Sequence, residues 1–262
     1  MSQSIAIIGG GNLGQAIASG LLSENFDPSN LTITRHKTHL LQTFADQGVR
    51  ITKDNNQAVQ DADTIIIAVK PYRISEVLQG IKTYISNDKL IISVVSDYSI
   101  EQMQNDLDST PIIFRAMPNT ASSVNESMTC IASNNGSESH TETVKSIFNA
   151  LGETIVINEQ LMDAATVLGA CGIAYVLRFI RGMIQGGIEI GFDAQTATKI
   201  ATQTVKGASE LLLQEGNHPE AEIDKVTTPK GCTIAGLNEM EHQGFSSALI
   251  KGIKTSYDNI SD

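Results

Sequence analysis

A glycine-rich turn between a short apolar run and a helix-like stretch constrains this fold more than any other feature. Residues 5–8 are apolar, Gly9, Gly11 and Gly14 follow in the pattern Gly-x-Gly-x-x-Gly, and residues 15–24 are compatible with a helix. In dinucleotide-binding folds the first glycine makes a tight turn, the second lets the backbone approach a pyrophosphate, and the third packs helix on strand. The phosphates then lie at the positive end of the helix dipole. The pattern therefore predicts a dinucleotide-binding turn.

Strand-like and helix-like runs alternate up to about residue 158. Residues 64–69 and 90–95 are continuous, β-branched apolar runs, which are typical of parallel strands buried on both faces. We expect further strands at residues 31–34, 112–116, 128–132 and 154–157, and helices at residues 38–47, 74–85 and 141–151. This order predicts an α/β protein with a Rossmann-like, doubly wound and mostly parallel sheet.

The pattern changes after residue 158, where strand-like runs stop. Helices are expected at residues 161–189, 194–215 and 245–257, so we divide the chain into domains 1–158 and 159–262, the second all-helical. The first of these helices carries five glycines, and each costs about 1 kcal/mol relative to alanine inside a helix. That cost favours a helix buried between two subunits, and burial within one subunit is the alternative.

Composition excludes several classes of protein. A formal net charge of -11 argues against a general affinity for nucleic acid or for an anionic membrane surface. Three cysteines that lie far apart, with no Cys-x-x-Cys pair, predict neither a disulfide framework nor a metal site. The uncharged residues 164–177 are shorter than the roughly 20 residues of a membrane helix. Without a basic leader and an apolar signal segment, we expect a cytoplasmic protein.

The end of the second predicted strand indicates which nicotinamide cofactor is bound. NAD-selective sheets place an acidic residue there, to accept hydrogen bonds from the ribose. This chain instead has Thr34-Arg35-His36-Lys37, which presents two cations and an imidazole. Arginine makes paired hydrogen bonds with phosphate, whereas a carboxylate repels it. We therefore expect NADP, with NADPH as the preferred donor and NADH as a possible second one; a solvated basic loop is the alternative.

Three further motifs, together with the glycine turn, carry a specific resemblance. They are Ala68-Val69-Lys70-Pro71, Arg115-Ala116-Met117-Pro118-Asn119-Thr120, and the stretch at residues 226–237 that contains Thr228-Pro229-Lys230-Gly231-Cys232-Thr233. Over essentially its whole length the chain resembles pyrroline-5-carboxylate reductase, the last enzyme of proline biosynthesis. The resemblance implies a helical dimerisation domain, a homodimer or a ring of dimers, and reduction of 1-pyrroline-5-carboxylate to proline by NAD(P)H.

The resemblance also assigns residues. It implies that Thr233 is catalytic and hydrogen-bonds the ring nitrogen of the substrate, although Thr233 could instead be a plain helix N-cap. Substrate contacts are expected at Asn119, Lys230, Gly231, Cys232 and Thr233. Cofactor contacts are expected at Ile8, Gly9, Gly10, Gly11, Asn12, Leu13, Gly14, Arg35, Asn55, Ala68, Val69, Lys70 and Pro71.

Two departures and two alternatives remain. The usual Gly-Ser-Gly-Pro-Ala-Tyr of the long helix is Ala170-Cys171-Gly172-Ile173-Ala174-Tyr175 here, and the loss of proline is expected to straighten the helix at that point. The family commonly has Ser-Pro-Gly-Gly-x-Thr near its C-terminus, whereas here Lys230 replaces the first glycine, which puts the shape of the turn in doubt. A related imine or β-hydroxyacid reductase is one alternative, but such dehydrogenases use a lysine in the helical domain, and none occurs between Gln160 and Ala197. The other alternative is an NADP-binding regulator that kept the fold and lost turnover.

Overall fold

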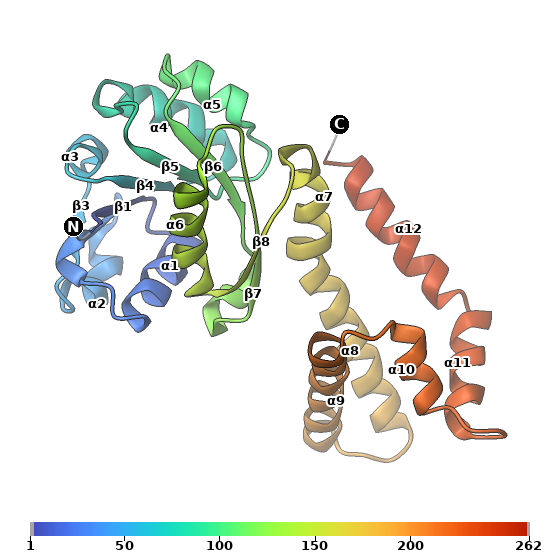
Figure 1. The fold of residues 1–262 in the computed structure, drawn as a ribbon. Helices are drawn as coiled ribbons and strands as arrows, with labels where there is room; N and C mark the ends of the chain where they lie inside the picture. The colour runs from blue at the N-terminus through green and yellow to red at the C-terminus, as the bar shows by residue number, and fades with distance from the viewer. Residues whose placement is uncertain (1–2, 261–262) are drawn as a thin grey trace. The chain divides into compact units, whose positions relative to one another are not determined.

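The computed structural model describes residues 3–260 and forms two compact units (Figure 1). The first unit ends at Cys171, and the second runs from Gly172 to Ile260. The predicted domain boundary after residue 158 stays a prediction.

An eight-stranded sheet forms the centre of the first unit, as the alternation of elements predicted. Its order is β3-β2-β1-β4-β5-β6-β7-β8, and every pair of neighbours is parallel except β6 and β7. The strands are β1 Ile5–Ile8, β2 Leu31–Thr34, β3 Arg50–Thr52, β4 Thr64–Ile67, β5 Leu90–Ser93, β6 Ile112–Met117, β7 Ser127–Ser133 and β8 Gly152–Val156.

Helices cover both faces of this sheet because its central strands are apolar on both sides (Figure 1). One face packs against α1, α2 and α6, and the other against α3, α4 and α5. Ile7 and Ile8, adjacent on β1, lie in opposite apolar layers and are 0% and 1% exposed. The helices are α1 Asn12–Ser23, α2 Gln42–Ala45, α3 Asn55–Gln60, α4 Ile74–Ile81, α5 Ile100–Leu107 and α6 Glu138–Asn149.

The sequence missed three short elements of this unit, namely β3, α3 and α5. β3 has three residues and α3 has six, too few to show a period. The helix expected at residues 38–47 is instead a 3₁₀ helix, Thr38–Leu41, followed by one turn of α-helix in α2.

The segment after β8 leads into the second unit without a break in helical backbone. It consists of a 3₁₀ helix, Glu159–Leu161, then α7, Met162–Ala165, then a π-helix, Thr166–Cys171, and then α8, Gly172–Glu189. The prediction of one uniform helix over residues 161–189 was therefore wrong in its first part, where the 3₁₀ helix and the π-helix replace regular α-helix.

The second unit is entirely helical. Tyr175 of α8 and Ser256 of α12 share a hydrogen bond of 2.6 Å, and the rings of Phe179 and Phe245 lie 5.9 Å apart. Within residues 3–260, the stretch Glu159–Glu189 is long and apolar enough to cross a membrane, by length and composition alone. It is longer than the uncharged run at residues 164–177 considered above. The helices besides α8 are α9 Ala194–Glu215, α10 Pro219–Lys225, α11 Cys232–His242 and α12 Phe245–Asp258.

Candidate active site

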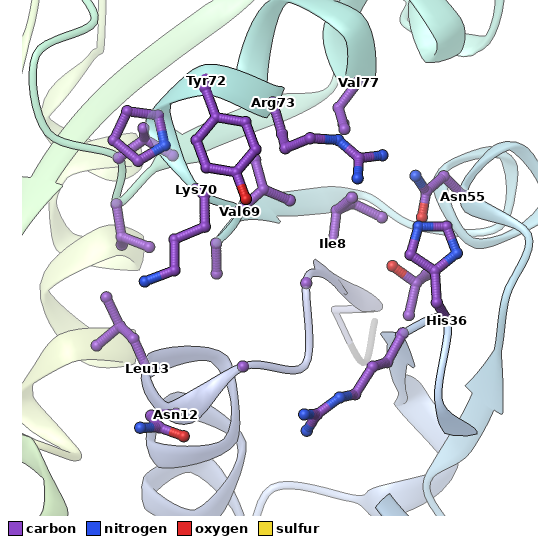
Figure 2. A pocket seen from close by; sticks show the side chains of 18 of the residues that line it. Ile8, Asn12, Leu13, His36, Asn55, Val69, Lys70, Tyr72, Arg73 and Val77 are labelled. Atoms are coloured by element: carbon purple, nitrogen blue, oxygen red, sulfur yellow. The ribbon is translucent and has the colours of Figure 1, made fainter. Parts of the chain in front are cut away.

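A cavity of about 630 Å³ opens at the carboxyl ends of the parallel strands of the first unit (Figure 2). Its lining comes from the glycine turn after β1, the ends of β2 and β3, and the residues that follow β4 and β5. Ligands of open parallel sheets bind at this edge, where the strand order changes direction. Here β1 has β2 on one side and β4 on the other, so the cavity lies at that switch point.

The three glycines of the turn have the geometry that the motif predicts. Gly9 has a φ of +114°, and a Cβ there would lie 2.4 Å from the carbonyl oxygen of Ala68. A Cβ on Gly14 would lie 2.2 Å from the carbonyl oxygen of Gly9, so the start of α1 packs directly on the turn. A Cβ on Gly11 would meet nothing within 4 Å. Gly11 therefore leaves the backbone open to a ligand in the cavity.

The amino end of α1 is free to take a phosphate. Gly11 is its N-cap and has no side chain to bond the first backbone N–H groups. Those groups need a partner, and the helix dipole makes an anion the favoured one.

Arg35 connects the end of β2 to the glycine turn. Its guanidinium Nη1 donates a hydrogen bond of 2.7 Å to the carbonyl oxygen of Gly10, which also accepts one of 3.1 Å from Gln15. The backbone N–H of Arg35 donates to the Thr52 carbonyl of β3, at 3.1 Å. Arg35 is thus fixed at the cavity wall by its backbone and by its side chain.

The lining is basic although the protein is acidic. Its basic or imidazole members are Arg35, His36, Lys53, Lys70 and Arg73, with no Asp or Glu among the lining residues. In a chain with a net charge of -11, this composition marks the cavity as a local anion site.

These basic groups are not equally free to bind a ligand. Arg73 is paired with Glu76, with 2.9 Å between Nε and a carboxylate oxygen. For Lys53 and Lys70, the structure of residues 3–260 records no hydrogen bond or ion pair of the side chain. Figure 2 shows the amine of Lys70 extending into the cavity above Asn12 and Leu13 of α1.

Most residues predicted to contact the cofactor line this one cavity. The exceptions are Gly10, whose Cβ position faces Leu41 and Ile33, and Gly14, which lies behind the turn. Lys37 of the predicted basic loop is not among the lining residues either. The predicted residues in the lining are Ile8, Gly9, Gly11, Asn12, Leu13, Arg35, Asn55, Ala68, Val69, Lys70 and Pro71.

Several lining residues were not predicted. Lys53 directly follows β3, and an assignment of that strand would have placed it beside Arg35 at the same sheet edge. Tyr72 is 84% exposed at the cavity, and Figure 2 shows its hydroxyl directed into it. Thr34 and His36 belong to the basic stretch predicted at the end of the second strand, although of that stretch only Arg35 was assigned as a contact. The others are Arg73, Val77, Val94, Val95 and Ser96.

Asn119 does not line the cavity. It is 8% exposed, and its side-chain oxygen accepts a hydrogen bond of 2.9 Å from the backbone N–H of Ala121. Its amide nitrogen donates a bond of 3.2 Å to the carbonyl of Gly169, in the π-helix. Both ends of this side chain are therefore engaged within the first unit.

The loop with the predicted substrate contacts belongs to the second unit and keeps a glycine-like shape. Lys230 has a φ of +62°, the left-handed conformation that glycine adopts most easily. A Cβ on Gly231 would lie 2.6 Å from the hydroxyl of Thr228, so that glycine is required by close approach. Lys230 thus keeps the turn at a cost of about 1–2 kcal/mol in backbone conformation.

Thr233 is not the N-cap of a helix, which was the alternative role expected from the sequence. Gly231 is the N-cap of α11, without a side-chain bond, and Thr233 lies one residue inside the helix. The side chain of Thr233 is exposed, and no hydrogen bond of its hydroxyl is recorded within residues 3–260. Its hydroxyl is available to a ligand.

Comparisons with known proteins cover both units. A family model described as pyrroline-5-carboxylate reductase dimerisation matches residues 159–262, and one described as NADP oxidoreductase, coenzyme F420-dependent, matches residues 4–97. Pyrroline-5-carboxylate reductase 2 of Dictyostelium discoideum is 44% identical, over 97% of this chain and 91% of that protein. Reductase 1 of the same organism is 46% identical over 97% of this chain, which spans 48% of that relative.

Solved structures agree with these sequence relatives. A pyrroline-5-carboxylate reductase from Coxiella burnetii superposes with a TM-score of 0.94 and 28% identity, over 100% of this chain and 98% of that one. Plasmodium falciparum pyrroline carboxylate reductase with NADP bound superposes with a TM-score of 0.88 and 28% identity, over 98% of this chain and 97% of that one. A 3-hydroxyisobutyrate dehydrogenase from Mycobacterium tuberculosis shares the fold alone, at 14% identity and a TM-score of 0.56. The predicted fold and resemblance are confirmed: the chain belongs to the pyrroline-5-carboxylate reductase family.

Proposed function

We propose that this protein reduces 1-pyrroline-5-carboxylate to L-proline with NADPH. The observation that carries the cofactor half of the proposal is the cavity at the glycine turn, which has five basic or imidazole side chains and no carboxylate. Near-complete matches to pyrroline-5-carboxylate reductases support the substrate half.

The residues present fit a dinucleotide that carries an extra phosphate. The open backbone at Gly11 and the uncapped start of α1 suit the pyrophosphate. Arg35, His36 and Lys53, at the ends of two adjacent strands, suit the 2'-phosphate, and we therefore propose NADPH as the preferred donor and NADH as a weaker one. Lys70 and Asn55 complete the proposed cofactor contacts.

When bound, NADPH supplies the hydride that reduces the imine carbon. In this proposal the chain's own part is positioning: the backbone from Lys230 to Cys232 binds the substrate carboxylate, and the hydroxyl of Thr233 hydrogen-bonds the ring nitrogen. The first N–H groups of α11 suit a carboxylate because Gly231 leaves them without a side-chain partner. Holding reactants in a near-attack geometry contributes several kcal/mol, so no dedicated acid is needed.

We further propose that the protein works as a homodimer, alone or within a ring of dimers. Only three hydrophobic residues of the described second unit are buried, Ile184, Ala197 and Ala201. Large apolar side chains are exposed along α8, such as Leu177, which is 59% exposed. Exposed apolar surface of this kind is typical of an interface, and the match of residues 159–262 to a dimerisation family supports a second copy of the chain as the partner. A cytoplasmic location, which three free thiols suit, is part of the same proposal.

The test is consumption of NADPH by the purified protein after addition of 1-pyrroline-5-carboxylate, repeated with Thr233→Ala. We expect turnover by the wild type and a loss of about 10²-fold in kcat for the variant, the usual cost of removing one hydrogen-bond donor at a reacting group. NADPH binding without any consumption would favour an NADP-binding regulator instead.

A further inference from the structure

The last residues of β6 and the loop that follows it hold the segment that leads into the second unit. We propose that Arg115 and Asn119 are positioning residues of the reaction proposed above: they fix the π-helix from which α8 continues, and neither binds the substrate. We call this contact the β6 seam. It joins Arg115, Met117 and Asn119 on one side to Glu159, Met162, Asp163 and Gly169 on the other.

Arg115 makes the first contact of the seam. Its side chain is 6% exposed and faces two carboxylates, with Nη1 3.5 Å from Glu159 and Nη2 3.9 Å from Asp163. Glu159 also accepts a hydrogen bond of 2.8 Å from the backbone N–H of Ile100, at the start of α5. A buried guanidinium is costly unless it is paired, so these carboxylates are drawn to β6. The 3₁₀ helix Glu159–Leu161 is thereby tied to the sheet.

Met117 makes the second contact, two residues further along β6. It is 8% exposed and packs in one apolar cluster with Met162, which is 0% exposed, and Ala132. This contact buries the start of α7 against β6 and β7, between the two polar contacts of the seam.

Asn119 makes the third contact, at the π-helix itself. A π-helix is rare and occurs often at functional sites. The amide nitrogen of Asn119 donates a hydrogen bond of 3.2 Å to the carbonyl of Gly169, inside this π-helix. The side chain is held in place for this bond, because its oxygen is engaged by Ala121 and its backbone N–H donates to the Ser127 hydroxyl at 3.0 Å.

The three contacts follow the chain in order, from Glu159 to Gly169, and end three residues before α8 begins at Gly172. The backbone is continuous from the π-helix into α8, so the seam holds the residues from which that helix begins. The loop proposed to hold the substrate belongs to the unit that this helix opens. A misplacement of about 1 Å far from the reacting atoms can lower a rate by about 10²-fold, so turnover is expected to depend on the seam.

A matched pair of variants tests the proposal, Asn119→Ala and Asn158→Ala. Both asparagines cap a 3₁₀ helix by accepting from the backbone N–H two residues on, at 2.9 and 3.0 Å, but only Asn119 reaches the π-helix. For Asn119→Ala we expect a fall in kcat of about tenfold or more, with KM for 1-pyrroline-5-carboxylate and Kd for NADPH within about twofold of wild type. Asn158→Ala is expected to keep all three values.

Amide hydrogen exchange measures the stability of the π-helix independently of turnover. Amide exchange in residues 166–172 should become faster in Asn119→Ala and stay unchanged in Asn158→Ala, whether or not the wild type reduces the substrate. If the wild type does not turn over, the proposed function fails, while the exchange data still decide whether Asn119 holds the π-helix.

Two results overturn the proposal. A rise in KM of about tenfold or more in Asn119→Ala with kcat unchanged would make Asn119 a substrate ligand, as the family resemblance implied. Equal effects of the two asparagine variants on kcat, or no change in exchange at residues 166–172, would remove the seam from the mechanism. Arg115→Lys, which keeps the charge and loses the forked guanidinium, should repeat the kcat-only pattern of Asn119→Ala.

Discussion

The guanidinium of Arg35 donates a 2.7 Å hydrogen bond to the carbonyl oxygen of Gly10. This bond joins the end of β2 to the glycine turn after β1, across two neighbouring strands whose ends line the cavity. The guanidinium of Arg35 therefore has two roles. Its Nη1 supports the glycine turn, and its remaining N–H donors lie at a cavity whose lining has no carboxylate.

Arg35→Ala is expected to weaken the binding of both cofactors, and the binding of NADPH more than that of NADH. Loss of the Gly10 bond loosens the turn that both cofactors share, and loss of the cation removes a contact that only the 2'-phosphate makes. Titration of each cofactor by fluorescence should give a loss of about tenfold or more for NADPH and a few-fold for NADH, on the scale of a charge-assisted hydrogen bond. An equal loss for the two would refute the assignment of Arg35 to the 2'-phosphate.

Lys53→Gln is expected to weaken the binding of NADPH and to leave the binding of NADH unchanged. Lys53 lines the cavity beside Arg35 and has no recorded hydrogen bond or ion pair within residues 3–260, so its removal disturbs no internal contact. The loss should be about three- to tenfold at low salt and should shrink as salt screens the charge. Lys37→Gln is the matched control, because Lys37 lies in the neighbouring loop but outside the lining. Equal effects of Lys53→Gln and Lys37→Gln on NADPH binding would indicate a general electrostatic effect of positive charge rather than a contact between Lys53 and the cofactor.

Lys230→Gly tests the one unusual residue of the substrate loop. Glycine removes the left-handed strain at a φ of +62° but adds backbone freedom to the unfolded chain, so the free energy of unfolding should change by less than about 1 kcal/mol. Because Lys230 is a proposed substrate contact and its ammonium would attract the substrate carboxylate, KM should rise several-fold with kcat unchanged. Thermal unfolding and steady-state kinetics measure the two effects, and an unchanged KM would leave Lys230 as a solvent-exposed residue of the turn.

Acid should destabilise the fold in part through Asp63. Hydrogen bonds from the backbone and side chain of Ser4 lower the pKa of Asp63 below its ordinary value of 3.8. A carboxylate whose pKa is depressed in the folded state stabilises it above the ordinary pKa, and that contribution disappears as pH falls through the lowered one. Melting curves of wild type and Asp63→Asn should therefore differ near neutral pH and converge below about pH 3.8. A constant difference at every pH would contradict this.

The sequence predicted the sheet and much of the cavity because those features are local. Continuous apolar runs marked β4 and β5, and the spacing of Gly9, Gly11 and Gly14 marked the turn. Lys53 was missed because β3 has only three residues and gives no period, so nothing placed its end beside Arg35.

Other features depend on contacts between distant residues. The bond from Asn119 to Gly169 spans 50 residues, and the π-helix that it meets has the composition of an ordinary helix. Likewise, sequence showed an unexpected lysine at residue 230 but not its φ, which is what preserves the turn.

Turnover tests the proposed reaction and the proposed role of Thr233 together. Purified protein should convert 1-pyrroline-5-carboxylate to L-proline with one NADPH consumed for each proline formed, and Thr233→Ala should bind NADPH as tightly as wild type while it loses most of that turnover. Proline formation that stays at the wild-type rate in Thr233→Ala would contradict the assignment of the site, and NADPH binding with no proline formed by the wild type would contradict the function itself.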